Sequence, residues 1–134
     1  MSTKSVAQKL LIKPNTSVWL SDSTQRALIE PLPQGTEMRE QMMDATTIVV
    51  FAPDSASLRA VLDEHRDQLA KPAAFWIAYP KGNRTDINRD SLWPILADYG
   101  MRPITQVAVD DVWSALRFRP LKKGEEPFTG GHAS

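Results

Sequence analysis

The sequence contains no cysteine and only two histidines, His65 and His132. Without thiols the chain forms no disulfide, thiolate metal site or cysteine nucleophile, and we expect a cytoplasmic protein. Two histidines are too few for a histidine-based metal centre, so we expect no metal. No apolar stretch approaches the roughly 18 residues of a membrane span, and the N-terminal sequence lacks a signal-peptide pattern. We therefore expect a soluble protein that does not associate with membranes.

A net charge is also lacking, because 16 Lys and Arg residues balance 16 Asp and Glu residues. Such a chain has no long-range attraction for nucleic acid. We therefore expect no nucleic-acid binding, although Arg117, Arg119, Lys122 and Lys123 lie close together in the sequence. The 134 residues suit one domain, which we place at residues 1–120. Residues 121–134 are polar and glycine-rich, and we expect a flexible tail.

Three short apolar runs predict strands buried on both faces, as in the middle of a parallel sheet. They are Ser17–Ser21, Thr46–Ala52 and Ala73–Tyr79. The third consists wholly of apolar or aromatic residues, and Pro80, Lys81 and Gly82 end it. We expect it to be the central strand and its aromatic side chains, with Trp19 of the first run, to lie in the core.

Helices are predicted between these strands. Lys4–Ile12 forms a short helix before a Lys-Pro-Asn turn, and Thr24–Glu30 forms another behind a cap at Ser21, Asp22 or Ser23. The most regular helix begins at Asp54 or Ser55 and ends at Lys71-Pro72. Its apolar stripe has helical spacing and comprises Leu58, Val61, Leu62, His65 and Leu69. We interpret His65 as a partly buried histidine and not as a ligand.

Two segments are less regular. Residues 35–43 predict a short strand over Thr36–Arg39 or a helix over Glu37–Met43, and the sequence favours neither. A helix is predicted over Ser91–Tyr99, and Asp90 or Ser91 is favoured over Asp86 as its cap, because Pro94 is best placed in the first turn. The alternative that Asp86 caps a separate first turn stays open.

The last elements predict an antiparallel hairpin. Ile104–Val109 and Val112–Arg119 are the two strands, and Asp110-Asp111 is the turn between them. In the second strand, Ser114, Leu116 and Phe118 share one face. Trp113, Ala115, Arg117 and Arg119 share the other. The arginines protect an exposed sheet edge in our interpretation; the alternative is that they stack a base together with Trp113.

These elements predict an α/β fold: a Rossmann-like, mostly parallel sheet with flanking helices and a C-terminal antiparallel hairpin. Helix, hairpin and central strand resemble a reduced Class I methyltransferase fold. However, the turn after the first strand is SDSTQRA, which contains no glycine, so the backbone of that turn cannot approach a cofactor closely. We therefore expect no S-adenosylmethionine or dinucleotide cofactor.

Three motifs, WIAYPKG, TDINRD and VAVDDVWSALRF, resemble the pattern of the small bacterial proteins grouped as domain of unknown function 3052. The resemblance extends from about Val6 to Pro120 and is sharpest over Phe75–Gly82 and Val107–Arg119. It implies a Rossmann-like fold and no particular activity.

Ligands of open α/β sheets bind beyond the carboxyl ends of the strands. Lys81 lies there, and with the amides of Gly82 and Asn83 it could hold a phosphate or carboxylate. We favour the simpler interpretation, a solvated lysine in a turn. Asp86 and Asp90 flank the same loop and could act as an acid and a base, but helix capping explains them equally simply, and we favour it.

Asp110 and Asp111 are unusual for a two-residue hairpin turn, which prefers Asn-Gly or Asp-Gly. Either the loop is longer or the pair lines a small-molecule pocket together with Trp113. We favour a turn that tolerates aspartate.

No nucleophile with a base, metal-ligand cluster or phosphate loop is recognisable. We therefore interpret the chain as a non-catalytic module with a regulatory or protein-interaction role, whose partner is another protein or a second copy. The alternative is a binding protein or enzyme for a small anionic ligand, such as a nucleotide or phosphate, at the carboxyl edge. Asp22, Asp54, Lys81 and Asp86 would converge there. The sequence does not decide whether the protein is an enzyme.

Overall fold

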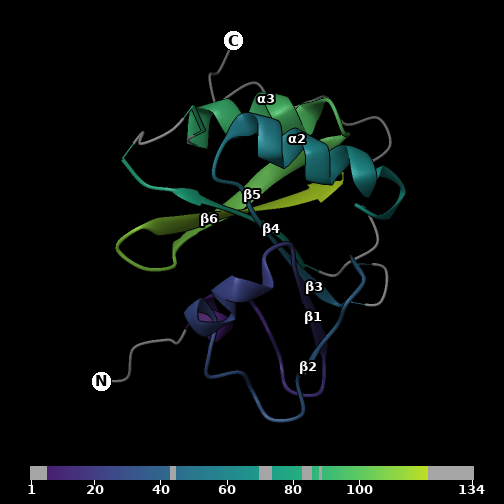
Figure 1. Ribbon diagram of the computed structural model, residues 1–134, viewed down its shortest axis with the longest axis vertical. Coiled ribbons are helices and arrows are strands. Elements are labelled where there is room, and N and C mark those ends of the chain that lie inside the picture. The colour runs from purple at the N-terminus through teal and green to yellow at the C-terminus, as the bar shows by residue number, and fades with distance from the viewer. Residues whose placement is uncertain (1–5, 43–44, 70–73, 83–85, 88, 121–134) are drawn as a thin grey trace.

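The computed structural model describes residues 6–42, 45–69, 74–82, 86–87 and 89–120. Its elements alternate between strands and helices (Figure 1). In chain order they are α1 (Val6–Lys9), β1 (Ser17–Leu20), the 3₁₀ helix η1 (Ser23–Leu28), β2 (Glu37–Met38), β3 (Thr47–Phe51), α2 (Ser55–Glu64), the 3₁₀ turn η3 (Arg66–Gln68), β4 (Ala74–Pro80), α3 (Arg89–Ala97), β5 (Met101–Ala108) and β6 (Trp113–Pro120).

The strands form one six-stranded sheet in the order β2-β1-β3-β4-β6-β5. The first four strands of this order are parallel, and β6 is antiparallel to both of its neighbours. The parallel part matches the 2-1-4-5 portion of the common doubly wound order 3-2-1-4-5-6. The fold is therefore Rossmann-like with an antiparallel hairpin, as the sequence predicts, and within the described residues it is a shortened form.

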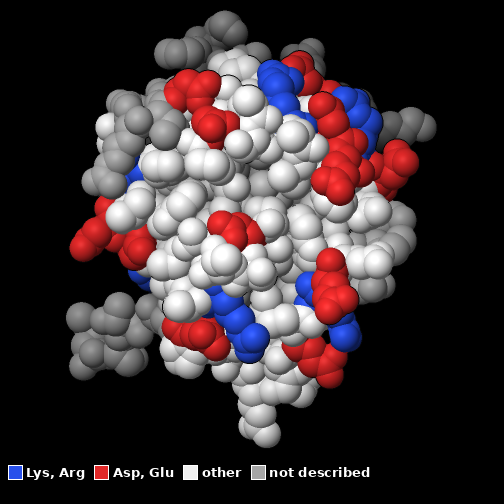
Figure 2. Space-filling model, in the orientation of Figure 1, with Lys and Arg blue, Asp and Glu red and all other residues white. Residues whose placement is uncertain are grey.

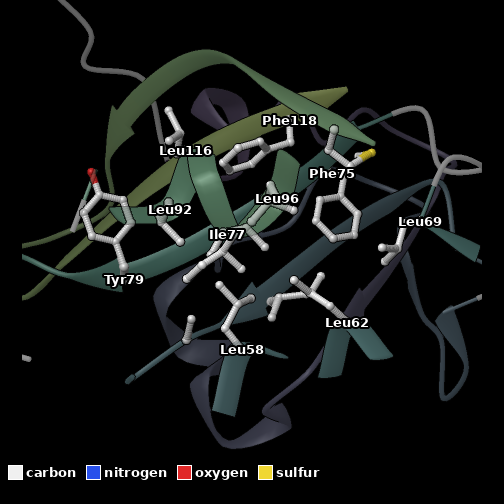
Figure 3. Packing of buried hydrophobic residues seen from close by; sticks show 14 of the residues in the cluster. Leu58, Leu62, Leu69, Phe75, Ile77, Tyr79, Leu92, Leu96, Leu116 and Phe118 are labelled. Carbon is white, nitrogen blue, oxygen red and sulfur yellow. The ribbon is translucent and has the colours of Figure 1, made fainter. Parts of the chain in front are cut away.

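Both faces of the sheet are covered (Figure 1). On one face, α2 and α3 pack on alternate residues of β3, β4 and β6. Figure 3 shows Ile77 of β4 in the middle of this core, among Leu58 and Leu62 of α2 and Leu96 of α3. On the other face, the segments around α1 and η1 cover Val49, Trp76 and Ala115, among others. All seven residues of β4 are buried, which confirms it as the central strand.

Local sequence explains most element boundaries. Asp54 caps α2, because its side chain accepts a hydrogen bond of 2.7 Å from the Ser57 amide. Asp22 caps η1 in the same manner through the Thr24 amide. Of the strand and the helix that the sequence left open for residues 35–43, the structure has the strand, over Glu37–Met38. Its Met38 pairs with Val18 of β1.

Three predicted helices differ from the structure. The first ends at Lys9, because the Leu11 and Ile12 amides bond back to the Gln8 and Ala7 carbonyls and close the helix. The second is a 3₁₀ helix over Ser23–Leu28. The third, α2, ends at Glu64 in a 3₁₀ turn, before the Lys71-Pro72 stop, which lies outside the described residues.

The prediction for α3 is wrong at its start. The helix begins at Arg89, so Asp90 and Ser91 are helical positions and not caps. Pro94 lies inside the helix, not in its first turn. Packing explains this, since Leu92, Ile95 and Leu96 of α3 are all buried in the core, and their burial outweighs the lost hydrogen bond of Pro94.

The predicted hairpin forms between β5 and β6, with Val107 opposite Ala115, although β5 begins at Met101 and not at Ile104. However, β6 lies inside the sheet and β5 forms its edge. The interpretation that Arg117 and Arg119 protect an exposed edge is therefore wrong. Trp19 is also only partly buried, whereas Trp76 and Tyr79 are core residues as predicted. The predicted tail, residues 121–134, lies outside the described residues.

Candidate functional site

The carboxyl ends of the parallel strands bring several predicted site residues to one edge of the sheet. Asp22 follows β1, Asp54 follows β3 and Lys81 follows β4. The hairpin loop lies at this edge as well, because Pro80, the last residue of β4, pairs with Trp113, the first residue of β6.

The aspartates at this edge are engaged by nearby backbone and hydroxyl groups. Hydrogen bonds from the Thr24 hydroxyl (2.5 Å) and amide (3.0 Å) lower the pKa of Asp22 below its usual range. Asp86 accepts hydrogen bonds from the hydroxyl and the amide (2.9 Å) of Ser55, and these bonds lower its pKa. Both carboxylates are therefore ionised at neutral pH and neither is poised to exchange protons.

Asp54 and Asp86 together occupy the N-terminus of α2, through the amides of Ser57 and Ser55. A helix N-terminus attracts anions through its free amides. Here two side chains of the protein take that place. The amides of Ser55 and Ser57 are therefore not free to bind an external anion.

Lys81 itself belongs to the strand-to-hairpin junction, since its amide donates a hydrogen bond of 2.7 Å to the Val112 carbonyl. The next residue, Gly82, is exposed and has a φ of +74°. Asn83 lies outside the described residues. A phosphate or carboxylate site at these three positions stays a prediction.

The hairpin loop is longer than a two-residue turn and comprises residues 109–112. The Asp110 carboxylate accepts hydrogen bonds from the amides of Val112 (2.8 Å) and Trp113 (2.7 Å), so it stabilises the loop. Asp111 is exposed. The Trp113 ring packs edge-on against Phe51 at 5.3 Å. A ligand role for Asp110, Asp111 and Trp113 stays a prediction.

Two hollows lie near the ends of β1 and β2, and Lys81 does not line either of them. Two cavities of about 650 Å³ and 380 Å³ adjoin there, and we call them together the β1–β2 cleft. Trp19, Ser21 and Glu40 line both cavities. The larger cavity also contacts Ser23, Arg26 and Arg39, and the smaller one contacts Val61, Glu64 and His65 of the α2 region.

Trp19 forms the flat wall of the cleft. Its indole N–H donates a hydrogen bond of 3.2 Å to the Glu40 carbonyl, so the segment after β2 is held across β1. On its other side the Trp19 ring meets the His65 ring edge-on, with centroids 5.2 Å apart. These contacts fix the indole while leaving it partly exposed.

The charged groups of the cleft are exposed and weakly paired. Arg26 lies 3.5 Å from Glu30, and Arg39 lies 2.8 Å from Glu37. The four side chains are between 42% and 64% exposed, and such surface pairs typically contribute about 0–1 kcal/mol. Either arginine can therefore exchange its partner for a ligand anion at little cost.

Of the predicted site residues that the structure describes, none lines the β1–β2 cleft, so the sequence-based prediction missed this site. A signal was present. In Rossmann-like folds an acidic residue about 20 positions after the first strand binds ribose hydroxyls. Glu40 lies near that spacing from Ser21, the residue that follows β1.

The turn after β1 does not fit the cradle that a dinucleotide or S-adenosylmethionine would require. It leads directly into η1, and Asp22 is extended with φ −130°. No residue between Ser21 and Leu28, all of which the structure describes, has a positive φ. Side chains therefore occupy the space that glycines leave open for a cofactor.

Other site classes find no support in the described part of the chain. No helix there is long and apolar enough to cross a membrane. No group of three metal-ligating side chains occurs among the same residues. Figure 2 shows acidic and basic side chains interspersed over the face that it displays.

No family model matches the chain, and no curated protein matches it. Solved structures are similar in fold. A protein of the NADB-Rossmann superfamily from Streptococcus agalactiae matches with a TM-score of 0.58 and 10% identity, over 97% of this chain and 72% of its own. A candidate tRNA methyltransferase from Streptococcus pneumoniae matches with a TM-score of 0.55 and 11% identity, over 92% and 70%. At these identities the similarity shows the Rossmann-like fold alone.

Proposed function

We propose that this protein is a non-catalytic binding module for a small anionic metabolite with a flat ring, of the size of a nucleoside monophosphate. The β1–β2 cleft is the binding site. The observation that carries the proposal is the combination, in one cleft, of a partly exposed indole, two arginines and two glutamates, Glu40 and Glu64. In open α/β sheets, ligands bind outside the carboxyl ends of the strands where the strand order reverses, and here it reverses at β1.

Each group of the cleft has a role that follows from its chemistry. The Trp19 indole offers a flat apolar surface for stacking a base, a contact worth about 1–3 kcal/mol per base. Arg26 and Arg39 offer guanidinium groups to a phosphate. Glu40 accepts hydrogen bonds from ligand hydroxyls. The cavity of about 650 Å³ is in the range of small-molecule sites.

The non-catalytic part of the proposal concerns the carboxyl edge beside the cleft, where two aspartates outside the cleft are not suited to proton transfer. A general acid or base works best when its pKa is near the operating pH. Among the aspartates at the carboxyl edge, Asp22 and Asp86 have lowered pKa values and hold backbone and hydroxyl groups. Ligand binding then has a regulatory role, in which a partner protein or a second copy of the chain recognises the form of the protein whose cleft is occupied.

The structural neighbours are compatible with this role. The Streptococcus pneumoniae neighbour is described as a candidate tRNA methyltransferase, and tRNA is itself built of nucleotides. The turn after β1 differs from a glycine cradle, so we propose a smaller ligand that stacks on Trp19 and does not require that turn.

A thermal-shift screen with adenosine, guanosine and uridine monophosphates and S-adenosylmethionine tests the proposal. Ligand at 100 times its dissociation constant adds about 2.7 kcal/mol, which raises the melting temperature of a domain of this size by roughly 10 °C. We expect one of the monophosphates to give such a shift and Arg39→Gln to weaken it.

Lys81→Ala is the matched control, because Lys81 lies at the same edge but outside the cleft. We expect it to leave the shift unchanged. A shift lost in Lys81→Ala and kept in Arg39→Gln would move the site to the end of β4 and contradict the proposal. Ligand recovered chemically altered after incubation would contradict the non-catalytic part.

A further inference from the structure

A second recess lies at the opposite, amino edge of the sheet. Its volume is about 410 Å³, and we call it the amino-edge recess. Thr16, Thr47 and Ala74 place it at the starts of β1, β3 and β4. The full lining is Leu11, Lys13, Thr16, Thr46, Thr47, Ala74 and Arg117. It shares no residue with the β1–β2 cleft.

The strand register brings Arg117 to this recess. Arg117 of β6 pairs with Trp76 of β4, two residues from the start of that strand. It lies on the same face of β6 as Ala115, which packs in the core on the α1 side of the sheet. Trp113 shares that face but lies at the carboxyl edge, against Phe51. The alternative that Trp113 and Arg117 stack a base together is therefore wrong.

The charged side chains that line the recess, among the described residues, are basic. Lys13 and Arg117 contribute two positive charges, and no described lining residue is acidic. Three threonines add hydroxyl groups, and Thr47 is only 1% exposed. An ammonium and a guanidinium that line the same recess together attract an anion more strongly than one isolated surface charge does. A guanidinium and an ammonium with hydroxyl donors suit an oxyanion.

Leu11 provides a second, independent observation. It has a φ of +63° at the position that closes α1, where the Leu11 amide bonds to the Gln8 carbonyl and the Ile12 amide to the Ala7 carbonyl. Glycine is the usual residue in this conformation, since a side chain there is strained. Leu11 is nevertheless 44% exposed, so it does not compensate for the strain by full burial. Its apolar side chain instead lines the recess.

We propose that the amino-edge recess binds a small organic phosphate, with Lys13 and Arg117 on the phosphate and Leu11 against its apolar part. This site is distinct from the one in the β1–β2 cleft. Thr47 offers its hydroxyl to the phosphate, whereas the hydroxyl of Thr16 donates to the Lys13 carbonyl (2.6 Å) and that of Thr46 bonds with the Ser17 hydroxyl (3.3 Å). Leu11 adds apolar area that inorganic phosphate alone cannot use, so the recess prefers a phosphate ester to free phosphate.

Isothermal titration of phenyl phosphate and inorganic phosphate tests this inference on the full chain. We expect phenyl phosphate to bind more tightly than inorganic phosphate. Arg117→Gln and Lys13→Gln should each weaken phenyl phosphate by about tenfold or more, the loss expected for a charge-assisted hydrogen bond. Arg119→Gln, on the same face of β6 but outside the recess, should leave the affinity within about twofold.

Leu11→Gly separates the ligand role from a structural one. Removing the strained side chain should raise the melting temperature by a few degrees while lowering the affinity for phenyl phosphate but not for inorganic phosphate. If Arg117→Gln does not fold, Lys13→Gln decides, because Lys13 is exposed. Binding that is absent at millimolar phenyl phosphate, or is unchanged in Lys13→Gln, would overturn the inference and leave the β1–β2 cleft proposal standing.

Discussion

Trp76→Phe tests how the short N-terminal segment is fastened to the sheet. Trp76 is 1% exposed, and its indole N–H donates a hydrogen bond of 2.9 Å to the Leu10 carbonyl. This bond joins the central strand to residues just after α1, which has only four residues. A helix of one turn is not stable alone in water, so tertiary contacts such as this one hold it in place.

The expected loss follows from two contributions. Leaving the buried Leu10 carbonyl without its donor costs about 1–3 kcal/mol. The smaller ring leaves a partly unfilled space on this side of the sheet, which costs roughly 1–2 kcal/mol more. We therefore expect the free energy of unfolding to fall by about 2–5 kcal/mol, equivalent to a melting temperature lower by roughly 8–20 °C.

Urea denaturation followed by circular dichroism measures the loss, and amide hydrogen exchange at Leu10 shows whether the segment loosens locally. Trp113→Phe is the control, because Trp113 is only partly buried and phenylalanine keeps a ring against Phe51. We expect it to cost less than about 1 kcal/mol. A Trp76→Phe loss no larger than that of the control would refute the reasoning.

Two further predictions concern local features of the fold. The hydrogen bonds from Ser55 lower the pKa of Asp86. The contribution of Asp86 to stability is therefore present above the ordinary aspartate pKa of 3.8 and disappears as the pH falls through the lower pKa of the folded state. In Asp86→Asn, we expect the urea midpoint to fall less between pH 5 and pH 2 than it does in the wild type. Gly35 has a φ of +78°, and a Cβ there would lie 2.0 Å from Oδ1 of Asn15. Gly100 has a φ of +74° but open space around it, so Gly100→Ala should lower the free energy of unfolding by about 1–2 kcal/mol through backbone strain alone. Gly35→Ala should lower it further, because of the contact with Asn15. Equal melting temperatures for the two variants would contradict that contact.

The sequence predicts those parts of the fold whose signals are local. β3 and β4 are continuous apolar runs, and both are buried along their whole length. The alternation in β6 is also local, and Leu116 and Phe118 pack on the α2 side while Ala115 packs on the other. The cap at Asp54 follows from the preference of aspartate for that position.

Features that depend on contacts between distant segments could not be predicted in this way. The start of α3 depends on packing of its apolar residues against the sheet, which overrides the local preference of Pro94 for a first turn. The strand order that places β6 inside the sheet is likewise a tertiary choice. No local pattern distinguishes an interior from an edge position for a strand that has one arginine-bearing face.

The β1–β2 cleft escaped prediction for the same reason. Trp19, Arg39 and Glu40 are separated along the chain, and they meet because β2 pairs with β1 and the Trp19 indole then bonds to the Glu40 carbonyl. The sequence predicts the candidate site beside Lys81 because that residue follows β4, whose apolar run is uninterrupted. The apolar run of β4 identifies the edge of the sheet at which a ligand would bind. The position of the binding site along that edge depends on where the strand order reverses.

The most direct test of the cleft is the effect of adenosine monophosphate on the four indole N–H signals in a proton–nitrogen NMR spectrum, assigned with single Trp→Phe variants. The indole of Trp19 lines the cleft, whereas Trp113 lies at the hairpin and Trp76 is buried on the α1 side. We predict that the Trp19 signal shifts most, and that Arg39→Gln reduces the shift at a given ligand concentration. A shift confined to Trp113, with Trp19 unchanged, would contradict the account and place the ligand at the hairpin loop.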